Sequence, residues 1–175
     1  EQFTFNTVQI VTMGLLVALE IVLSRFGSIN LWNLKIGLAF VPVMLTGMLM
    51  GPVKSAFVAV VSDVVGALLF PSGAFFPGFT VTALLRGILY GGLLYKKPSM
   101  LNITIVAVID QLVLSLFLTS FWLSILYASP YMPLVVSRLI QVLPLLPIEI
   151  AIAAAMPKLL VDRLKPVIKQ NNKKK

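Results

Sequence analysis

The sequence predicts an all-α integral membrane protein with six transmembrane helices and both termini in the cytoplasm. Composition, the spacing of apolar runs and the placement of basic residues support this fold class. Of the 175 residues, 59% are hydrophobic and 11% are charged, and the mean hydropathy is +1.01. A soluble domain is usually about a quarter charged, so this chain has too little polar surface to stay in water. A spanning helix needs roughly 20 residues, so about six spans with short connections fill the chain.

Turn-forming residues divide the chain into the spans of one predicted transmembrane domain, residues 1–175. Gly51-Pro52 separates the second span from the third, Lys96 to Ser99 the fourth from the fifth, and Ser129 to Pro133 the fifth from the sixth. The predicted spans are residues 8–26, 34–50, 53–70, 80–95, 101–127 and 134–164. Residues 165–175 are predicted to form a basic cytoplasmic tail.

The 14 Lys and Arg residues orient these spans. Most of them fall on the side of the termini, so the positive-inside rule places both termini in the cytoplasm. We therefore interpret the net charge of +8 as contact with the lipid of the cytoplasmic membrane face, and we expect no nucleic-acid partner. Arg25, Lys35, Arg86 and Arg138 break the rule and fall in the outer half of the membrane. We predict a positively charged cavity that opens outward; the alternative is that each side chain reaches separately to the lipid headgroups.

The stretch from Asp63 to Gly92 places an aromatic turn between a buried acid and a buried base. The turn contains four phenylalanines and four turn-forming residues: Phe70, Phe75, Phe76, Phe79, Pro71, Gly73, Pro77 and Gly78. A charge inside a bilayer is costly, so it usually lines a cavity or pairs with another charge. Asp63 is predicted either to pair with Arg86 or to accept hydrogen bonds from a ligand, with the turn as a lid. The alternative is a helix connector whose aromatic residues lie at the membrane interface.

Two further acids, Asp110 and Glu149, fall inside the fifth and sixth spans. They are interpreted as structural hydrogen-bonding residues or as proton carriers. Nothing in the sequence places them at the level of the basic cluster.

The composition also excludes several kinds of chemistry. The chain has no Cys and no His, which excludes disulfides, the usual zinc sites and Ser–His or Cys–His catalysis. We expect no metal, no cofactor and no enzymatic activity. The chain has no GxxxxGK[ST] phosphate loop and no evident repeat halves. It is therefore either a self-contained facilitator or channel for an anionic solute, or one subunit of a larger machine.

The first span carries a pair of small residues, Gly14 and Ala18, four positions apart. Such a pair lets another helix backbone approach closely, which suits a subunit that docks on a partner. Ordinary packing inside the bundle is the alternative.

The sequence resembles the substrate-binding S component of an energy-coupling factor (ECF) vitamin transporter of the folate-specific type. The resemblance rests on ALEIVLSRF at 18–26, LKIGLAFVPVMLTGMLMGP at 34–52 and SDVVGALLFPSGAFFPGFTVTALLRGILYGG at 62–92. The small pair of the first span also contributes, with Gly14 where the family usually has alanine. The resemblance implies a high-affinity vitamin-binding subunit in the bacterial plasma membrane. It also implies a transmembrane coupling subunit that docks on Gly14 and Ala18, and two ATPase subunits that drive release.

The resemblance further implies a pocket at the outer ends of the spans, capped by the loops after the first, third and fifth. In this sequence the pocket residues would be Arg25, Lys35, Phe75, Phe76, Phe79, Arg86, Trp122, Tyr131, Arg138 and Gln141. Folate suits them, because aromatic side chains stack on its flat pterin and basic side chains bind the carboxylates of its glutamate tail. Riboflavin or pantothenate would keep the architecture and change the ligand.

Overall fold

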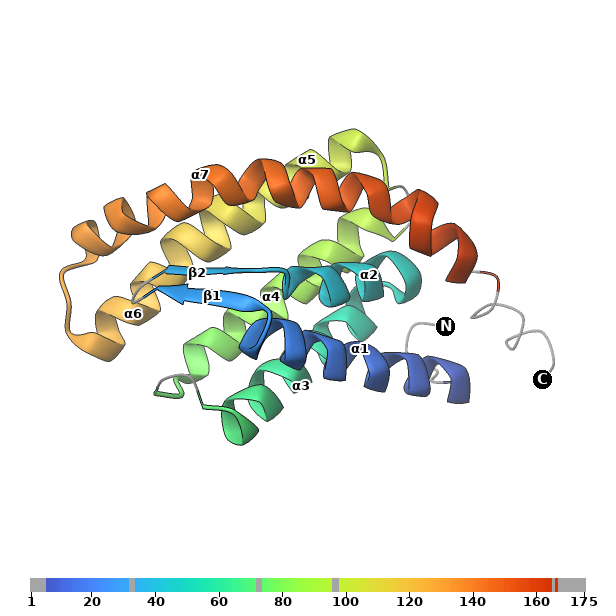
Figure 1. The fold of residues 1–175 in the computed structure, drawn as a ribbon, viewed down its shortest axis with the longest axis horizontal. Helices are drawn as coiled ribbons and strands as arrows, with labels where there is room; N and C mark the ends of the chain where they lie inside the picture. The colour runs from blue at the N-terminus through green and yellow to red at the C-terminus, as the bar shows by residue number, and fades with distance from the viewer. Residues whose placement is uncertain (1–5, 32–33, 72–73, 96–97, 165, 167–175) are drawn as a thin grey trace.

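The computed structural model describes residues 6–31, 34–71, 74–95, 98–164 and 166, which are predominantly helical (Figure 1). α5, the π-helical segment η1 and α6 follow one another without a break, as do α7 and the π-helical segment η2. In chain order the elements are α1 (Thr7–Arg25), β1 (Ser28–Leu31), β2 (Leu34–Gly37), α2 (Phe40–Met50), α3 (Pro52–Leu69), α4 (Pro77–Leu94), α5 (Met100–Val108), η1 (Ile109–Leu118), α6 (Thr119–Tyr127), α7 (Tyr131–Met156) and η2 (Pro157–Val161).

Long apolar helices confirm that the chain is a multi-helix membrane protein. Large apolar side chains point away from the bundle: Leu15, Leu68 and Leu101 are 68%, 73% and 71% exposed, which suits contact with lipid. Within the described residues, five helices are long and apolar enough to cross a membrane: Thr7–Arg25, Pro52–Leu69, Pro77–Leu94, Met100–Tyr127 and Val142–Leu164.

The predicted second span, residues 34–50, differs from the observed structure. Its first residues form β2, and α2 begins only at Phe40 and has 11 residues. Every residue of α2 except Val41 is buried. A helix that is apolar all round is buried in protein or in lipid, and at this length the protein interior is the commoner site. The apolar run therefore predicted the position of this helix but overestimated its length, because residues 34–37 pair in a hairpin.

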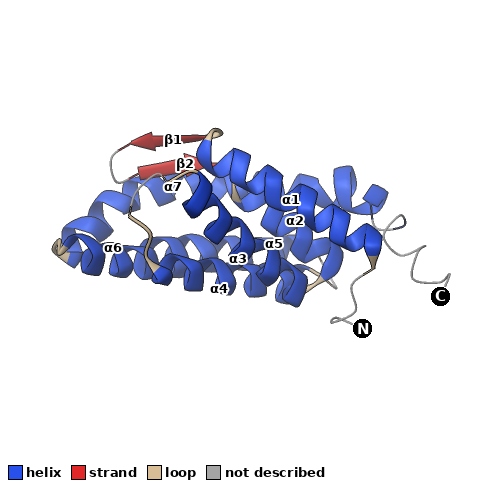
Figure 2. Cartoon of the chain, turned by 90° about the horizontal axis from the view of Figure 1, so that it is seen from below, coloured by secondary structure: helices blue, strands red, loops and turns tan. Residues whose placement is uncertain are grey.

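A two-stranded antiparallel hairpin joins α1 to α2 and was not predicted. Its strands pair Ser28 with Gly37 at one end and Leu31 with Leu34 at the other. β2 also packs beside α7, and the hairpin covers one side of the helices at the end where α6 lies (Figure 2). Strands of four residues are too short to show a clear alternation of apolar and polar side chains, so no pattern in the sequence indicated them.

Glycines bring α2, α3 and α4 into close contact. A Cβ atom at Gly47 of α2 would lie 2.8 Å from the backbone nitrogen of Gly91 in α4, and a Cβ atom at Gly91 would overlap Pro52 at the start of α3. Small residues at a helix crossing let two backbones approach in this way. Tyr90, which precedes Gly91, is thereby fully buried in the core.

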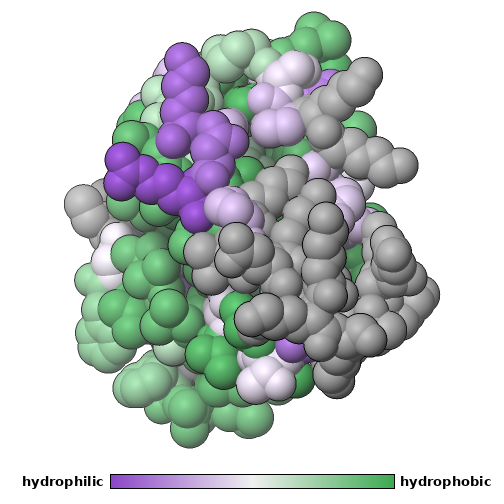
Figure 3. Space-filling model, turned by 90° about the vertical axis from the view of Figure 1, so that its right-hand side faces the viewer, coloured by the Kyte–Doolittle hydropathy of each residue, from purple (hydrophilic) through white to green (hydrophobic). Residues whose placement is uncertain are grey.

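The start of α1 and the end of η2 lie at the same end of the bundle (Figure 1). The hairpin and the connections after α3 and α6 lie at the opposite end. Lys158, Asp162 and Arg163 are exposed close to the end of the described chain. Seen from this side, hydrophilic side chains gather on one part of the surface beside hydrophobic ones (Figure 3). The predicted tail, residues 165–175, lies outside the described residues apart from residue 166.

Candidate functional site

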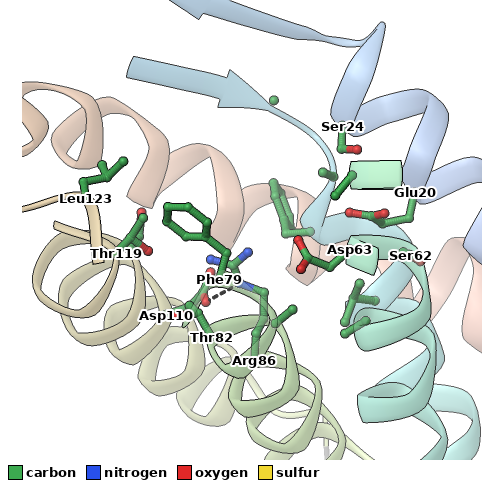
Figure 4. Close-up of a pocket in the computed structure, with 18 of the residues that line it drawn as sticks. Glu20, Ser24, Ser62, Asp63, Phe79, Thr82, Arg86, Asp110, Thr119 and Leu123 are labelled. Atoms are coloured by element: carbon green, nitrogen blue, oxygen red, sulfur yellow. Dashed lines mark hydrogen bonds and ion pairs between the residues drawn. The ribbon is translucent and has the colours of Figure 1, made fainter. Parts of the chain in front are cut away.

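A cavity of about 990 Å³ lies between the helices near the hairpin. This volume is at the upper end of the roughly 300–1,000 Å³ typical of small-molecule sites. The hairpin's last residue and the connections after α3 and α6 all contribute to the lining, so the cavity lies toward the end opposite the termini. Six helical elements, α1, α3, α4, η1, α6 and α7, contribute polar residues to the lining (Figure 4): Glu20, Ser24, Arg25, Ser62, Asp63, Thr82, Arg86, Asp110, Gln111, Ser115, Thr119 and Arg138.

Three of the four bases that break the positive-inside rule line this one cavity. They are Arg25 of α1, Arg86 of α4 and Arg138 of α7. Arg25 lies along α3, where a Cβ atom at Gly66 would be 3.4 Å from its guanidinium. The side chain of Lys35, the fourth base, lies outside the described residues.

Acids share the same cavity. Glu20, Asp63 and Asp110 all line it, so its described lining carries charges of both signs. The sequence predicted a positively charged cavity because it did not bring Glu20 and Asp110 beside the arginines. A lining of mixed sign suits a ligand that carries both anionic groups and hydrogen-bond donors.

Arg86 pairs with Asp110, whereas the sequence had suggested a pair with Asp63. Its Nε atom donates to Asp110 Oδ1 across 2.6 Å, and its side chain is 29% exposed (Figure 4). The prediction failed because it considered as a partner for Arg86 only the acid of the preceding span, Asp63. The acid that contacts Arg86 belongs to η1. Arg86 is the tenth residue of α4, so it lies about 14 Å along that helix at 1.5 Å per residue.

Asp110 belongs to a buried polar cluster that the sequence analysis missed. The Tyr90 hydroxyl lies 2.9 Å from Asp110 Oδ2 and 3.0 Å from Glu149 Oε1. The Gln111 amide donates to Glu149 Oε2 across 2.7 Å. Asp110 therefore meets Arg86 at the cavity wall, and Glu149 lies behind it, connected through Tyr90; the sequence had not indicated either placement. Tyr90 could have indicated this cluster in the sequence, because it follows Arg86 by four residues and so lies on the same face of the helix.

Asp63 is held at the cavity wall by a neighbour from α4. Its Oδ2 atom accepts a hydrogen bond from the Thr80 hydroxyl across 2.7 Å. Asp63 reaches from α3 toward the space between the helices (Figure 4). Of the two predicted roles, pairing with Arg86 is therefore replaced by this contact, and a role in ligand binding remains a prediction.

Arg138 is buried in the cavity wall without a counter-ion among the described residues. Only 8% of its surface is exposed, and its Nε atom has no hydrogen-bond partner in the part of the chain that the structure describes. Burying a charge without a partner is costly. Since Arg138 lines a large cavity, the structure provides a place where an anion would supply the missing contact.

The aromatic turn forms two layers. Phe75 and Phe79 line the cavity. Phe76 packs behind Phe79 and against Trp122, with ring centroids 6.1 and 5.7 Å apart. The Trp122 indole donates to the Thr82 hydroxyl across 3.0 Å. Phe76 and Trp122 therefore support the residues that face the cavity.

The last two predicted pocket residues are placed differently. The Tyr131 hydroxyl donates to the Phe117 carbonyl across 3.3 Å, and Tyr131 is not among the described lining residues. The side chain of Gln141 lies outside the described residues.

The small pair of α1 faces away from the bundle. Gly14 and Ala18 are both exposed, and a Cβ atom at Gly14 would meet no atom within 4 Å. Ordinary packing inside the bundle, the alternative considered for this pair, is therefore not what the structure shows.

Comparison with known proteins gives consistent matches over nearly the whole chain. The family profile described as "ECF transporter, substrate-specific component" matches residues 8–161. A folate transporter FolT of Clostridium novyi (strain NT) is 37% identical over 153 residues, covering 87% of this chain and 88% of the relative. A folate transporter FolT of Leuconostoc mesenteroides is 31% identical over 155 residues, covering 85% and 83%. A crystal structure of FolT bound with folic acid superposes with a TM-score of 0.82 at 35% identity, covering 86% of this chain and 93% of that one.

Proposed function

The chain belongs to the substrate-specific components of ECF transporters, and from this premise we propose that it is the high-affinity folate-binding subunit of an ATP-driven vitamin uptake transporter. Two relatives that match most of its length are named folate transporters. The similar solved structure was obtained with folic acid bound. These similarities favour folate over riboflavin or pantothenate.

The cavity chemistry supports the same ligand. Folate carries two carboxylates at one end and a pterin, with ring N–H and amino donors, at the other. Arg138, buried and without a described partner, suits a carboxylate, while the Asp63 carboxylate suits the donors of a pterin. The observation that carries the proposal is that these two residues line one cavity large enough for such a ligand.

Titration of the detergent-solubilised protein with folate, followed by calorimetry or tryptophan fluorescence, tests the proposal. We expect nanomolar-range binding without metal or ATP, because the site is composed of the chain's own side chains. Riboflavin and pantothenate serve as comparison ligands. Absence of binding at micromolar folate, together with clear binding of either comparison ligand, would overturn the folate assignment and leave the family membership intact.

We further propose six passes through the bacterial plasma membrane with both termini in the cytoplasm. The helical stretches α1, α2, α3, α4, α5 to α6 and α7 give six passes, with the short α2 surrounded by the others. The common location of the start of α1 and the end of η2 supports an even number of passes (Figure 1). Exposed Lys158 and Arg163 near that end suit the cytoplasmic face.

Transport would require partners. The chain contains no phosphate-binding P-loop motif, so we assign ATP hydrolysis to two separate ATPase subunits and not to this chain. We propose that a transmembrane coupling subunit docks on the exposed face that carries Gly14 and Ala18, where small residues permit close approach of another helix. A self-contained facilitator is the competing function, and it predicts folate transport by the purified chain alone.

A further inference from the structure

The buried cluster below Arg86 holds two carboxyl groups that share one hydroxyl. Tyr90 lies 2.9 Å from Asp110 Oδ2 and 3.0 Å from Glu149 Oε1. A tyrosine hydroxyl has a single proton and donates a single hydrogen bond. If both acids were ionised, one of these short contacts would join two acceptors. A proton on one of the two carboxyl groups gives each of these contacts its own donor.

The surroundings of the two acids differ. Asp110 Oδ1 accepts from the Arg86 guanidinium across 2.6 Å, so this carboxyl group has a cation in direct contact. Glu149 is fully buried, and among the described residues its second oxygen accepts only from the neutral Gln111 amide. Burial without a cation in contact favours the neutral carboxylic acid.

We propose that Glu149 carries this proton, and that Glu149 and Tyr90 are positioning residues for the Arg86–Asp110 ion pair at the cavity wall. The Glu149 carboxylic acid donates to the Tyr90 hydroxyl, which in turn donates to Asp110. Asp110 then accepts from both Tyr90 and Arg86. Among the described residues only Nε of Arg86 is engaged in a hydrogen bond, so its terminal nitrogens stay available to the cavity.

The charges around Glu149 are consistent with this arrangement. α4 contributes Arg86 and Tyr90, and η1 contributes Asp110 as its titratable group. From α7 itself Arg138 lies three turns away along the helix. α2, which also packs on α7, is apolar apart from Thr46, whose hydroxyl donates to the Pro42 carbonyl. An ionised Glu149 would add a second buried negative charge beside a single guanidinium.

Infrared spectroscopy of the ligand-free protein tests the protonation directly and does not depend on the identity of the ligand. A protonated carboxylic acid has a C=O stretch above the amide band, and the chain has only six Asp and Glu residues. Near neutral pH we expect one such band, which disappears in Glu149→Gln and persists in Asp110→Asn. Asp162→Asn, a change at an exposed acid, is the matched control and should leave the band unchanged. Absence of the band in the wild type, or its loss in Asp110→Asn alone, would overturn the assignment.

Folate binding tests the positioning role, and this second measurement rests on the proposed function. In Glu149→Gln the new side-chain amide can donate to Tyr90 as a carboxylic acid does, so this variant should keep the affinity within about threefold of wild type. Glu149→Ala and Tyr90→Phe break the chain of hydrogen bonds and should weaken binding about tenfold. Asp110→Asn removes the counter-ion of Arg86 and should weaken binding at least as much.

A loss in Glu149→Gln as large as in Glu149→Ala would overturn the positioning role. Failure of the wild type to bind folate would instead contradict the proposed function and leave the infrared result to decide the proton.

Discussion

The backbone of Gly87 in α4 lies so close to Ala56 in α3 that a Cβ atom at Gly87 would be 2.5 Å from the Ala56 Cα atom. The neighbouring atom belongs to the backbone and cannot move aside as a flexible side chain would. Arg86 directly precedes this contact in α4, and Asp63 follows it by two turns in α3. The contact therefore sets the separation of two walls of the cavity.

Gly87→Ala should destabilise the fold, because the added methyl group forces α3 and α4 apart. Overpacking of this kind typically costs about 1–3 kcal/mol, and an obstructing backbone places this site toward the upper end. The free energy of unfolding in detergent, from a denaturant titration, gives the measurement. Gly92→Ala is the control, since a Cβ atom there meets nothing within 4 Å. Equal stability of the two variants would show that the helices separate without cost.

Composition and turn residues were sufficient to predict the helical membrane fold. The observed α1, Thr7–Arg25, and the continuous helix Met100–Tyr127 lie within one residue of the predicted spans 8–26 and 101–127. The hairpin and the short α2 were not predictable from local pattern. An apolar run reports only that its surroundings are apolar, and four-residue strands carry little periodic signal.

The structure brings together several residues that the sequence had named, but it pairs them differently. Arg25, Arg86 and Arg138 meet in one cavity, as the positive-inside exceptions suggested. The partner of Arg86 is Asp110, which lies 24 residues further along the chain on another helix. Which of several buried acids meets a given base depends on helix rotation and packing, and a single sequence contains neither.

Arg138→Leu should weaken folate binding and stabilise the ligand-free protein. Hydrogen bonds to a charged group contribute about 1.5–3 kcal/mol, so the dissociation constant should rise about 10- to 100-fold. Removing a buried charge without a described partner also removes its desolvation cost, so the melting temperature without ligand should rise. Both quantities can be measured on one preparation, by calorimetry and by thermal denaturation.

Arg163→Leu, a change at an exposed arginine, is the matched control for Arg138→Leu and should alter neither quantity. A lower melting temperature in Arg138→Leu with unchanged affinity would mean that Arg138 has a structural role and does not bind the ligand.

Asp63→Asn should weaken folate binding about tenfold or more, because an amide replaces one acceptor oxygen with a donor and removes the charge. Thr80→Val removes only the hydroxyl that holds Asp63, and it should weaken binding by less than about threefold. Comparison of the two dissociation constants separates ligand contact from structural support. Equal small effects would indicate that Asp63 serves only to fix the start of α4.

Gly14→Trp should leave folate binding intact and abolish ATP-driven uptake. Gly14 and Ala18 are exposed, and a Cβ atom at Gly14 meets nothing within 4 Å, so an indole there fits the isolated chain. The same indole would obstruct a partner helix that approaches this small pair. Binding is measured in detergent, and uptake of labelled folate is measured in cells that contain the coupling and ATPase subunits. Gly92→Trp, at another exposed glycine with open space, should preserve both. Undiminished uptake with Gly14→Trp would place the docking surface elsewhere on the chain, because an indole on α1 would then not obstruct the coupling subunit.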